Sequence, residues 1–580
     1  MRFRLILKVF LVIVLLGAMG VAGVIGYRLV QKPQKAPVVV SKKEKAEKPE
    51  WIGNKPAPKT IEPGAYLAAL NAVFNDDLEK AANYYLNVLK GDPDNEEIQR
   101  EAYFFNAILG NFDVLKDVVH KMPEDYRTVF FTHYVQMGLM IQNEDWAGLR
   151  EEINKIRLSP LDEIIVPMVK AWSYAGEKDY EAAIKALNPL KKSKDLLVYY
   201  NYHCGLISLM LGQEFAADEA FQNLAKEKLY IFSMYPEIIS FYISRGGWGP
   251  DNPLYAQWQE FFKEQPAAAE LISLAAASPI TAKRGCAEVF YNMSSAMGAS
   301  KNSYEGALIL SALSLYLNPN QNLPKLWSAE ILEQAKKPAL AAHYYSKLAQ
   351  GLTQTIDFKR ASNLIACGRE KEAKPILLKL MQANKDSSQL WWSLASVYQS
   401  EKNWPAAIRA YTRILEIEGE SNRKRASGIY FARAFMYSAQ KNWQKEEQDL
   451  LRALDLNPDD PFLLNHLGYK WLENDKMVDK GFELVKRAHE MRPKDPNIMD
   501  SIAFGYYRKA DYQKALPLAE RSVDIMPQSS VTNAHLGDIY HALGRYREAV
   551  FQYKKALALK YDLTPELKQE LLHKIARKGK

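Results

Sequence analysis

One short segment has side chains at the spacing of a calcium-binding loop. Asp455, Asn457 and Asp459 alternate along the chain, as the first three ligands of such a loop do. The loop also needs a glycine at its sixth position for a sharp turn and a glutamate at its twelfth for bidentate coordination. Here the sixth position holds no glycine, and the twelfth is His466. We therefore interpret the segment as a turn between helices and not as a metal site.

The other residues that could do chemistry lack the arrangement that chemistry requires. The sequence has no Gly-x-x-x-x-Gly-Lys phosphate loop, no His-Glu-x-x-His zinc helix and no Gly-x-Ser-x-Gly elbow. Gly246, Gly247 and Gly249 follow no predicted strand, and His203 beside Cys204 is interpreted as a packed residue of a helix. The three cysteines lie more than 80 residues apart, which excludes a disulfide scaffold. The sequence thus predicts no catalytic residue, no cofactor and no metal ion.

The positive net charge is concentrated at the N-terminus. Residues 1–63 carry twelve basic and four acidic side chains, whereas the remaining 517 residues carry 64 of each. A protein that binds nucleic acid should carry its positive charge on the folded part, where phosphates would lie. The charge distribution therefore argues against nucleic acid as a partner.

The N-terminus contains a hydrophobic run typical of a membrane segment. Residues 9–27 include no charged side chain, and as a helix they would span about 28 Å, close to the thickness of the hydrocarbon core. Arg2, Arg4 and Lys8 precede the run and favour a cytoplasmic N-terminus. We expect a single-pass anchor in a bacterial inner membrane, with the body of the protein in the periplasm. The glycines of this run would also allow self-association of the membrane helix; the alternative is that they are tolerated in a helix that faces lipid.

Two alternatives to this topology stay open. The sequence Gly20-Val21-Ala22 offers a cleavage site, so the run is also compatible with a signal peptide. Basic residues soon after the run weaken the charge asymmetry, so a body that faces the cytoplasm is the second alternative. The segment that follows, residues 31–63, is rich in proline and lysine and is expected to be a disordered tether.

Beyond this tether the sequence repeats every 34 residues. Small side chains recur at that interval, as in Ala183 and Ala217, Ala307 and Ala341, Ala373 and Ala407, and Gly481, Ala515 and Ala549. Such spacing predicts antiparallel helix pairs that approach closely at the small residues. Prolines near the end of the period, such as Pro458 and Pro493, would end the second helix of a pair. The predicted fold class is all-α, a right-handed tetratricopeptide solenoid of about twelve helical hairpins.

The same features predict six segments along the chain. They are an anchor or signal (1–30), a tether (31–63), a first repeat group (64–230), an irregular helical connector (231–285), a second repeat group (286–560) and a C-terminal capping helix (561–580). The connector is interpreted either as a hinge or as helices packed between two solenoid halves, because its Gly/Pro-rich loop breaks the period. One further departure is Glu446, which stands where the other repeats have a small residue.

The second repeat group resembles a known family. Segments 457–473, 499–527 and 533–557 are similar to the proteobacterial envelope tetratricopeptide proteins, and the resemblance covers roughly residues 281–560. Members of that family include outer-membrane lipoproteins that present cell-wall hydrolases to a periplasmic carboxyl-terminal processing protease. The resemblance implies an adaptor whose partners are a protease and its substrates. The chain departs from the family at its N-terminus, where a hydrophobic run replaces the lipidated cysteine.

In tetratricopeptide solenoids the first helix of each pair lines a concave groove. The groove positions of the second repeat group are Trp392, Phe431, Phe435, Phe462, Asn465, Tyr469, Asp500, Phe504, Tyr507, Arg508, Asp538 and His541. Aromatic residues with a few polar ones suit the recognition of extended or helical peptide segments. The alternative is that some of these rings pack between hairpins.

Three functions are compatible with these features. The first is a membrane-tethered scaffold in the periplasm that binds proteins, among them a protease and its substrates. The second is a scaffold that faces the cytoplasm within an inner-membrane assembly. The third is an export or glycan-handling component, or an enzyme that carries a repeat domain. Apart from the N-terminal run and tether, no stretch longer than about 55 residues lies outside the array, so an enzyme would lack room for a catalytic domain.

Overall fold

The structure, a computed structural model, describes residues 63–74, 77–122, 131–156, 158–227, 231–262, 279–298, 304–348, 352–559 and 562–576. Every regular element among these residues is a helix, which confirms the all-α prediction. Within these ranges, none of the helices combines the length and the apolar character needed to cross a bilayer. The expected membrane run, residues 9–27, and most of the expected tether lie outside the described residues.

Contacts divide the chain into two compact units. Unit 1 extends to Ile376 and unit 2 begins at Leu377, so the boundary falls within helix α22 (Glu370–Ala383). The sequence had indicated a division at residues 285 and 286. The boundary lies further along the chain because the helices that follow residue 281 pack against the N-terminal hairpins.

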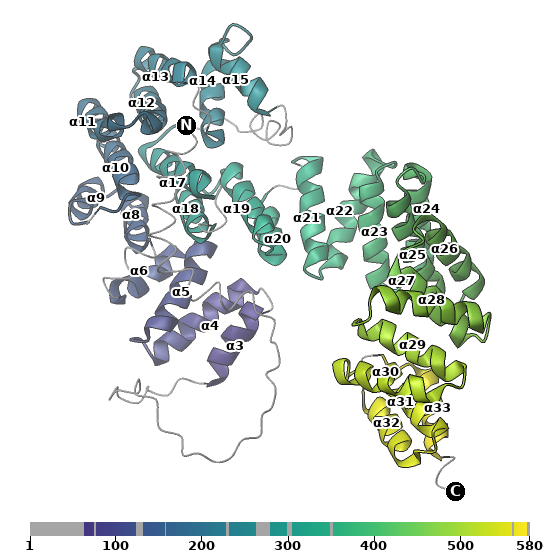
Figure 1. The fold of residues 1–580 in the computed structure, drawn as a ribbon. Coiled ribbons are helices and arrows are strands. Elements are labelled where there is room, and N and C mark those ends of the chain that lie inside the picture. The colour runs from purple at the N-terminus through teal and green to yellow at the C-terminus, as the bar shows by residue number, and fades with distance from the viewer. Residues whose placement is uncertain are drawn as a thin grey trace. The chain divides into compact units, whose positions relative to one another are not determined.

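Unit 1 consists of successive antiparallel hairpins (Figure 1). Its helices before the division that the sequence indicated are α3 (Pro63–Phe74), α4 (Leu78–Gly91), α5 (Glu96–Leu109), α6 (Phe112–Lys121), α8 (Thr132–Gln142), α9 (Trp146–Ile153), α10 (Asp162–Gly176), α11 (Tyr180–Ala186), α12 (Leu197–Met210), α13 (Glu214–Glu227), α14 (Tyr235–Ile243) and α15 (Pro253–Phe262). After it come α17 (Ala282–Gly298), α18 (Tyr304–Leu317), α19 (Asn322–Gln334), α20 (Pro338–Ser346) and α21 (Gln354–Ala366).

Unit 2 contains the hairpins in which the 34-residue repeat pattern is clearest. They are α23 (Ser388–Ser400) with α24 (Trp404–Glu418), α25 (Arg423–Ala439) with α26 (Trp443–Leu456), α27 (Pro461–Glu473) with α28 (Val478–Met491), α29 (Pro496–Arg508) with α30 (Tyr512–Ile525), and α31 (Ser530–Ala542) with α32 (Tyr546–Ala558). A further helix, α33 (Pro565–Ala576), packs against α32 and buries Leu571.

Local sequence sets where these helices begin. In unit 2, Ser387, Asn403, Asn422 and Asp495 each precede a helix, and the side chain of each accepts a hydrogen bond from a backbone N–H of the first turn. These N–H groups have no partner within the helix, so a short polar side chain at this position stabilises its start. The local sequence therefore determines where each helix begins, and the packing between hairpins determines how they are arranged.

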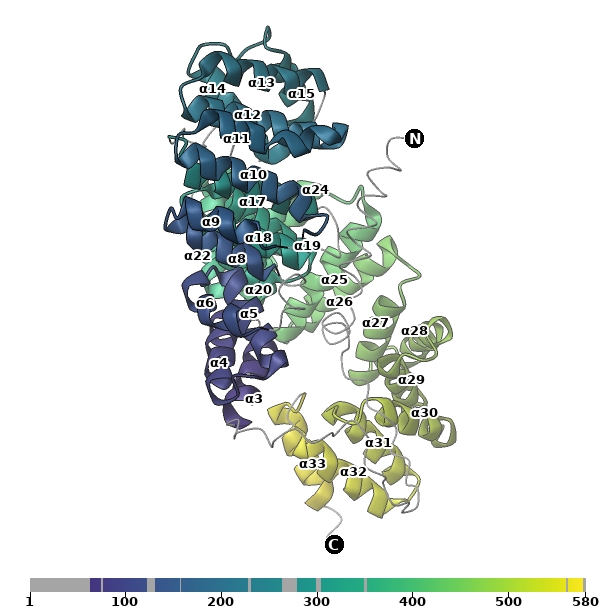
Figure 2. The same cartoon turned by 90° about the vertical axis from the view of Figure 1, so that its left-hand side faces the viewer.

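The inner side of unit 1 is covered by its own helices. α17 contacts α8, α10 and α12, and α18 contacts α5 and α8. These four partners are the first helices of consecutive hairpins, the helices that would line a concave face. Figures 1 and 2 both show α17 and α18 alongside α8 and α10. α20 extends this covering, because the Tyr344 hydroxyl donates to the backbone carbonyl of Ile108 in α5.

The covering helices approach closely through glycine. A Cβ atom added to Gly285 of α17 would lie 2.2 Å from the indole ring of Trp172 in α10. Gly138 of α8 meets Leu313 of α18 in the same way, at 2.7 Å. Trp172 is fully buried, so its ring has little room to move. The absence of a side chain at these positions allows the two layers of helices to touch.

A buried polar cluster also holds α17 in place. Tyr202 of α12 donates a hydrogen bond to Glu288 of α17, and Gln321 donates to the other carboxylate oxygen. Arg284, one turn before Glu288, forms an ion pair with Glu237 of α14. Burial, together with the negative charge of Glu237, raises the pKa of Glu288 to about 8. Since buried polar groups are costly when unpaired, these contacts favour one placement of α17.

Replacing Gly285 by alanine should therefore destabilise unit 1. The added methyl group overlaps the Trp172 ring, and overpacking of this kind costs about 1–3 kcal/mol. The matched control is Gly428→Ala in α25, where an added Cβ meets nothing within 4 Å. This control should keep or raise stability, because glycine within a helix costs about 0.5–1 kcal/mol relative to alanine. Thermal unfolding followed by circular dichroism would compare the two, and equal melting curves would contradict the close packing.

Candidate protein-binding face

In unit 2 the first helices of the last three hairpins lie next to one another. α27 contacts α29, and α29 contacts α31. The rings of Tyr469 in α27 and His535 in α31 have centroids only 6.0 Å apart, although a whole hairpin lies between them in the sequence. Side chains two hairpins apart can meet only on the shorter side of a curved stack. We call this side the inner face and define it by Phe431, Phe435, His466, Tyr469, Asp500, Phe504, Tyr507 and His535.

One aromatic cluster of the inner face joins α25 and α27. The ring of Phe431 lies 4.8 Å from that of Phe435, and His466 lies 4.7 Å from Phe435, measured between centroids. Phe435 is 43% exposed, whereas Phe431 and His466 are half-buried. A large apolar side chain exposed to this extent beside two other rings offers a contact for a partner.

This cluster explains the unusual residue Glu446. Its carboxylate is buried, and Oε1 lies 3.3 Å from Nε2 of His466. Glu446 lies in the first turn of α26, at the position where other hairpins carry alanine or glycine, and it faces the first helix of the next hairpin. The larger side chain is therefore accommodated by a polar contact with a histidine that also packs against the phenylalanines.

A second aromatic cluster joins α27, α29 and α31. The Phe504 ring stacks on His535 with centroids 4.6 Å apart, and on Tyr507 at 6.0 Å. Tyr469 completes the cluster at 5.6 Å from Phe504. Burial and the negative charges of Glu473 and Asp500 raise the pKa of Tyr469 far above its ordinary value, so its hydroxyl stays uncharged. Tyr469, Phe504 and Tyr507 are half-buried.

A buried ion pair supports the second cluster from below. Nδ1 of His535 lies 2.9 Å from Oδ2 of Asp500, and both residues are buried. Burial lowers the pKa of His535, but the charge of Asp500 and its hydrogen bond outweigh that effect and raise it overall. The pair therefore fixes the ring on which Phe504 stacks.

The other predicted polar groups have partners within unit 2. Arg508 donates to the backbone carbonyl of Leu472 and forms an ion pair with Asp475. Asp538 accepts hydrogen bonds from Tyr553 and from Lys574 of α33. These charges are committed to internal contacts, so aromatic surface is what the inner face offers to a partner.

The remaining predicted residues lie outside the two clusters. Trp392 packs edge-on against Tyr411 of α24, and the guanidinium of Arg492 lies 5.0 Å above the ring of Phe462. Asn465 is half-buried, and its Oδ1 atom accepts no hydrogen bond from the residues described. His541 is exposed beside Tyr546. The sequence thus identified the helices that carry the inner face but not which of their side chains meet.

Two members of the inner face were missed by the sequence reading. His466 and His535 both occupy the sixth position of their hairpins, next to a position that was expected to face the groove. Taken singly, each histidine resembles an ordinary packed residue. The sequence feature that could have indicated their role is that both histidines occupy the same repeat position. The described residues contain no cluster of three metal-binding side chains, and neither histidine belongs to such a group.

The charged state of His535 should make unit 2 more stable at low pH. Its pKa is higher in the folded chain than in the unfolded chain. The added stability is therefore complete below the unfolded value of about 6.5 and is lost as pH rises through the folded value. Urea denaturation at pH 6 and pH 9 should show a larger loss of unfolding free energy for the wild type than for His535→Gln. Parallel losses in the two proteins would mean that the pair with Asp500 is uncharged.

Comparisons with known proteins agree with the repeat pattern. Residues 532–562, which include most of α31 and α32, match the family model of the tetratricopeptide repeat. A TPR repeat-containing protein of Pseudomonas aeruginosa is 26% identical over 214 residues, which are 36% of this chain and 35% of that protein. Superkiller complex protein 3 of Mus musculus is 33% identical over 84 residues, 14% of this chain and 5% of that protein.

A solved structure from Parabacteroides merdae, also a tetratricopeptide repeat protein, is 16% identical, with a TM-score of 0.35. The similarity covers 44% of this chain and 98% of that one. Residues 532–562 thus carry a tetratricopeptide repeat, and the 34-residue spacing extends the same pattern to other hairpins of the chain.

Proposed function

We propose that this protein is a scaffold that binds segments of partner proteins on the inner face of unit 2. The observation that carries the proposal is the gathering of rings from α25, α27, α29 and α31 on one side of the stack. Tetratricopeptide-repeat proteins generally bind proteins or peptides, and no catalytic arrangement was found in the sequence. The proposal concerns the two aromatic clusters defined above.

The contrast with unit 1 supports this choice of face. There the corresponding first helices, α5, α8, α10 and α12, are covered by α17 and α18. Rings such as Tyr134 and Tyr202 are fully buried under that layer. In unit 2 the equivalent rings stay partly exposed, with Phe435 at 43%. A partner would find apolar surface to bury in unit 2, where unit 1 has already buried its own.

The chemistry of the face favours a partner segment with apolar anchors. Buried aromatic side chains commonly contribute most of the binding energy of an interface, about 2 kcal/mol or more each on truncation. Asp500, Arg508 and Asp538 are paired internally, so they add little direct attraction for a charged segment. Amphipathic helices and extended segments that carry an aromatic or aliphatic side chain every few residues are therefore the expected ligands.

The double variant Phe504→Ala/Tyr507→Ala should lose this binding. A display library of random 16-residue peptides, selected on the full chain, would supply ligands whose affinity is then measured by fluorescence anisotropy. Loss of one ring anchor weakens binding about thirtyfold, and loss of two weakens it further. Helicity and the melting transition should stay close to those of the wild type.

The matched control is Phe551→Ala, which removes a ring that is 65% exposed on α32, the second helix of its hairpin. It should bind selected peptides as the wild type does. If the Phe504→Ala/Tyr507→Ala variant also binds normally, the rings are structural and the partner site lies elsewhere.

The proposal extends to location and partners. The uncharged run at residues 9–27, with basic residues before it, supports a single-pass inner-membrane anchor with the body in the periplasm. The resemblance to envelope adaptors supports a processing protease and its cell-wall substrates as the proteins that meet on the scaffold. These two points rest on the sequence alone.

Topology can be measured with two fusions after residue 63. Alkaline phosphatase, which folds only outside the cytoplasm, should be active, and a cytoplasm-only reporter should be silent. The reverse pattern would place the body in the cytoplasm and support the second function considered from the sequence, a scaffold of an inner-membrane assembly.

A further inference from the structure

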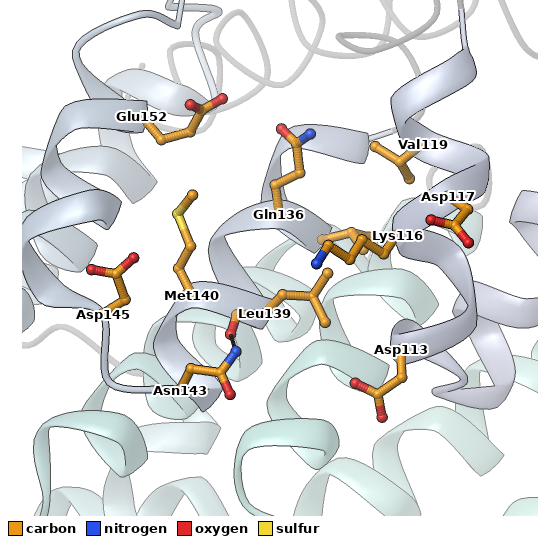
Figure 3. Close-up of a pocket in the computed structure, with 11 residues that line it drawn as sticks. Asp113, Lys116, Asp117, Val119, Gln136, Leu139, Met140, Asn143, Asp145 and Glu152 are labelled. Carbon is orange, nitrogen blue, oxygen red and sulfur yellow. Dashed lines mark hydrogen bonds between the residues drawn. The ribbon is translucent and has the colours of Figure 1, made fainter.

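A pocket of about 640 Å³ opens on unit 1. It lies over α8, between α6 and α9 (Figure 3). α6 and α9 each contact α8, and both are second helices of their hairpins. The pocket is thus a trough over one helix, bounded by the two helices on either side.

Acidic side chains surround this trough. Figure 3 shows Glu152 and Asp145 on one side and Asp113 and Asp117 on the other, with Gln136, Leu139 and Met140 between them. Lys116 is the one basic residue among those that line the pocket. Asp117 is exposed and makes no ion pair or hydrogen bond with the residues described. Leu139 and Met140 are half-buried and give the trough an apolar floor.

Negative and positive charges are concentrated in different segments of the first 376 residues. Residues 64–160 carry 16 acidic and nine basic side chains, whereas residues 161–376 carry 22 of each. The excess negative charge of residues 64–376 therefore belongs to the first hairpins, which include those that form the trough. The segment directly before them, residues 28–62, carries nine basic and four acidic side chains. Opposite charges lie on adjacent parts of one chain, where a link of a few tens of residues gives a high effective concentration.

We propose that residues 35–45 of this chain dock in the trough over α8. This segment reads Lys-Ala-Pro-Val-Val-Val-Ser-Lys-Lys-Glu-Lys. Its three valines match the floor of Leu139 and Met140. The lysines on both sides of them match Asp117 and the other carboxylates of the trough, which also contact Tyr316, the backbone N–H of Gly148 and Lys155. The occupant thus has an apolar centre between positive ends, and the pocket has an apolar floor between negative sides.

The chain is long enough for this contact. Lys45 lies 18 residues before Pro63, the first described residue, so the link can extend to about 60 Å. α3 and α6 are three helices apart, and neighbouring helices pack 8–10 Å apart, which gives a separation of about 30 Å. Docking would also place α6–α9 within a few residues of the uncharged run at residues 9–27, and so fix unit 1 beside it.

Photo-crosslinking within the full chain tests the proposal. A benzophenone side chain in place of Gln136, at the centre of the trough, should crosslink to a peptide that includes residues 35–45 of the same molecule. Mass spectrometry of the monomer band would identify it. The same probe in place of Lys185, an exposed residue of α11 outside the trough, should give no such product.

Charge variants test the electrostatic part. Asp117→Lys, or Lys42→Glu with Lys43→Glu, should lower the crosslink yield about fivefold, and raised salt should do the same. The matched control is Glu181→Lys, a charge reversal at an exposed site of α11, which should leave the yield unchanged. The proposal would be overturned by a crosslink between two copies or by a crosslink to any other segment. It would also be overturned if the charge variants left the crosslink yield unchanged.

Discussion

A stack of helical hairpins has an inner side whose apolar side chains must be covered or left for a partner. One hairpin buries its surface only against its neighbours, and curvature brings the first helices together on the shorter side. In unit 1 the chain covers this side with α17 and α18. In unit 2, α33 lies against part of this side, where Lys574 pairs with Asp538, yet the rings of the two aromatic clusters stay partly exposed. Unit 1 therefore buries its inner side within the chain, whereas unit 2 leaves part of its inner face for the proposed partner.

The covering of unit 1 depends on small residues and on a few buried polar contacts. Gly285 allows α17 to lie against the Trp172 ring, and Glu288 accepts hydrogen bonds from two different elements. Hydrophobic area alone would tolerate several placements of α17. The glycine and the polar cluster favour one of them, since any other leaves buried polar groups unpaired. In unit 2 the pair of Asp500 and His535 acts similarly, because it fixes a ring on which Phe504 stacks.

Much of this fold could be predicted from the sequence, because its period and capping residues act locally. The interval from Ala307 to Ala341 is the same 34 residues as that from Ala515 to Ala549. The period therefore places α18 and α20 in a repeat array, but it cannot tell that this part of the array turns back onto earlier hairpins. That outcome depends on contacts such as Gly285 with Trp172, more than 100 residues apart. For this reason the two compact units divide at residues 376 and 377, further along the chain than the expected division between the repeat groups.

The sequence predicted the helices and several rings of the candidate site, but not the contacts between its side chains. Repeat positions identified α25, α27, α29 and α31 and five of the clustered rings, because those positions face inward in any such stack. They did not reveal that Asp500, Arg508 and Asp538 are paired internally, since each partner comes from another helix or turn. Nor did they reveal His466 and His535, whose importance lies in the rings they touch.

Hydrogen–deuterium exchange of the full chain, with and without a bound peptide ligand, most directly tests whether unit 2 holds the partner. Exchange reports local opening, so a bound segment slows it where the segment lies. We expect slower exchange to be confined to α25, α27, α29 and α31, and unit 1 to exchange alike in both states. New protection in α5, α8 or α10, with α25–α31 unchanged, would contradict the assignment of the binding face to unit 2.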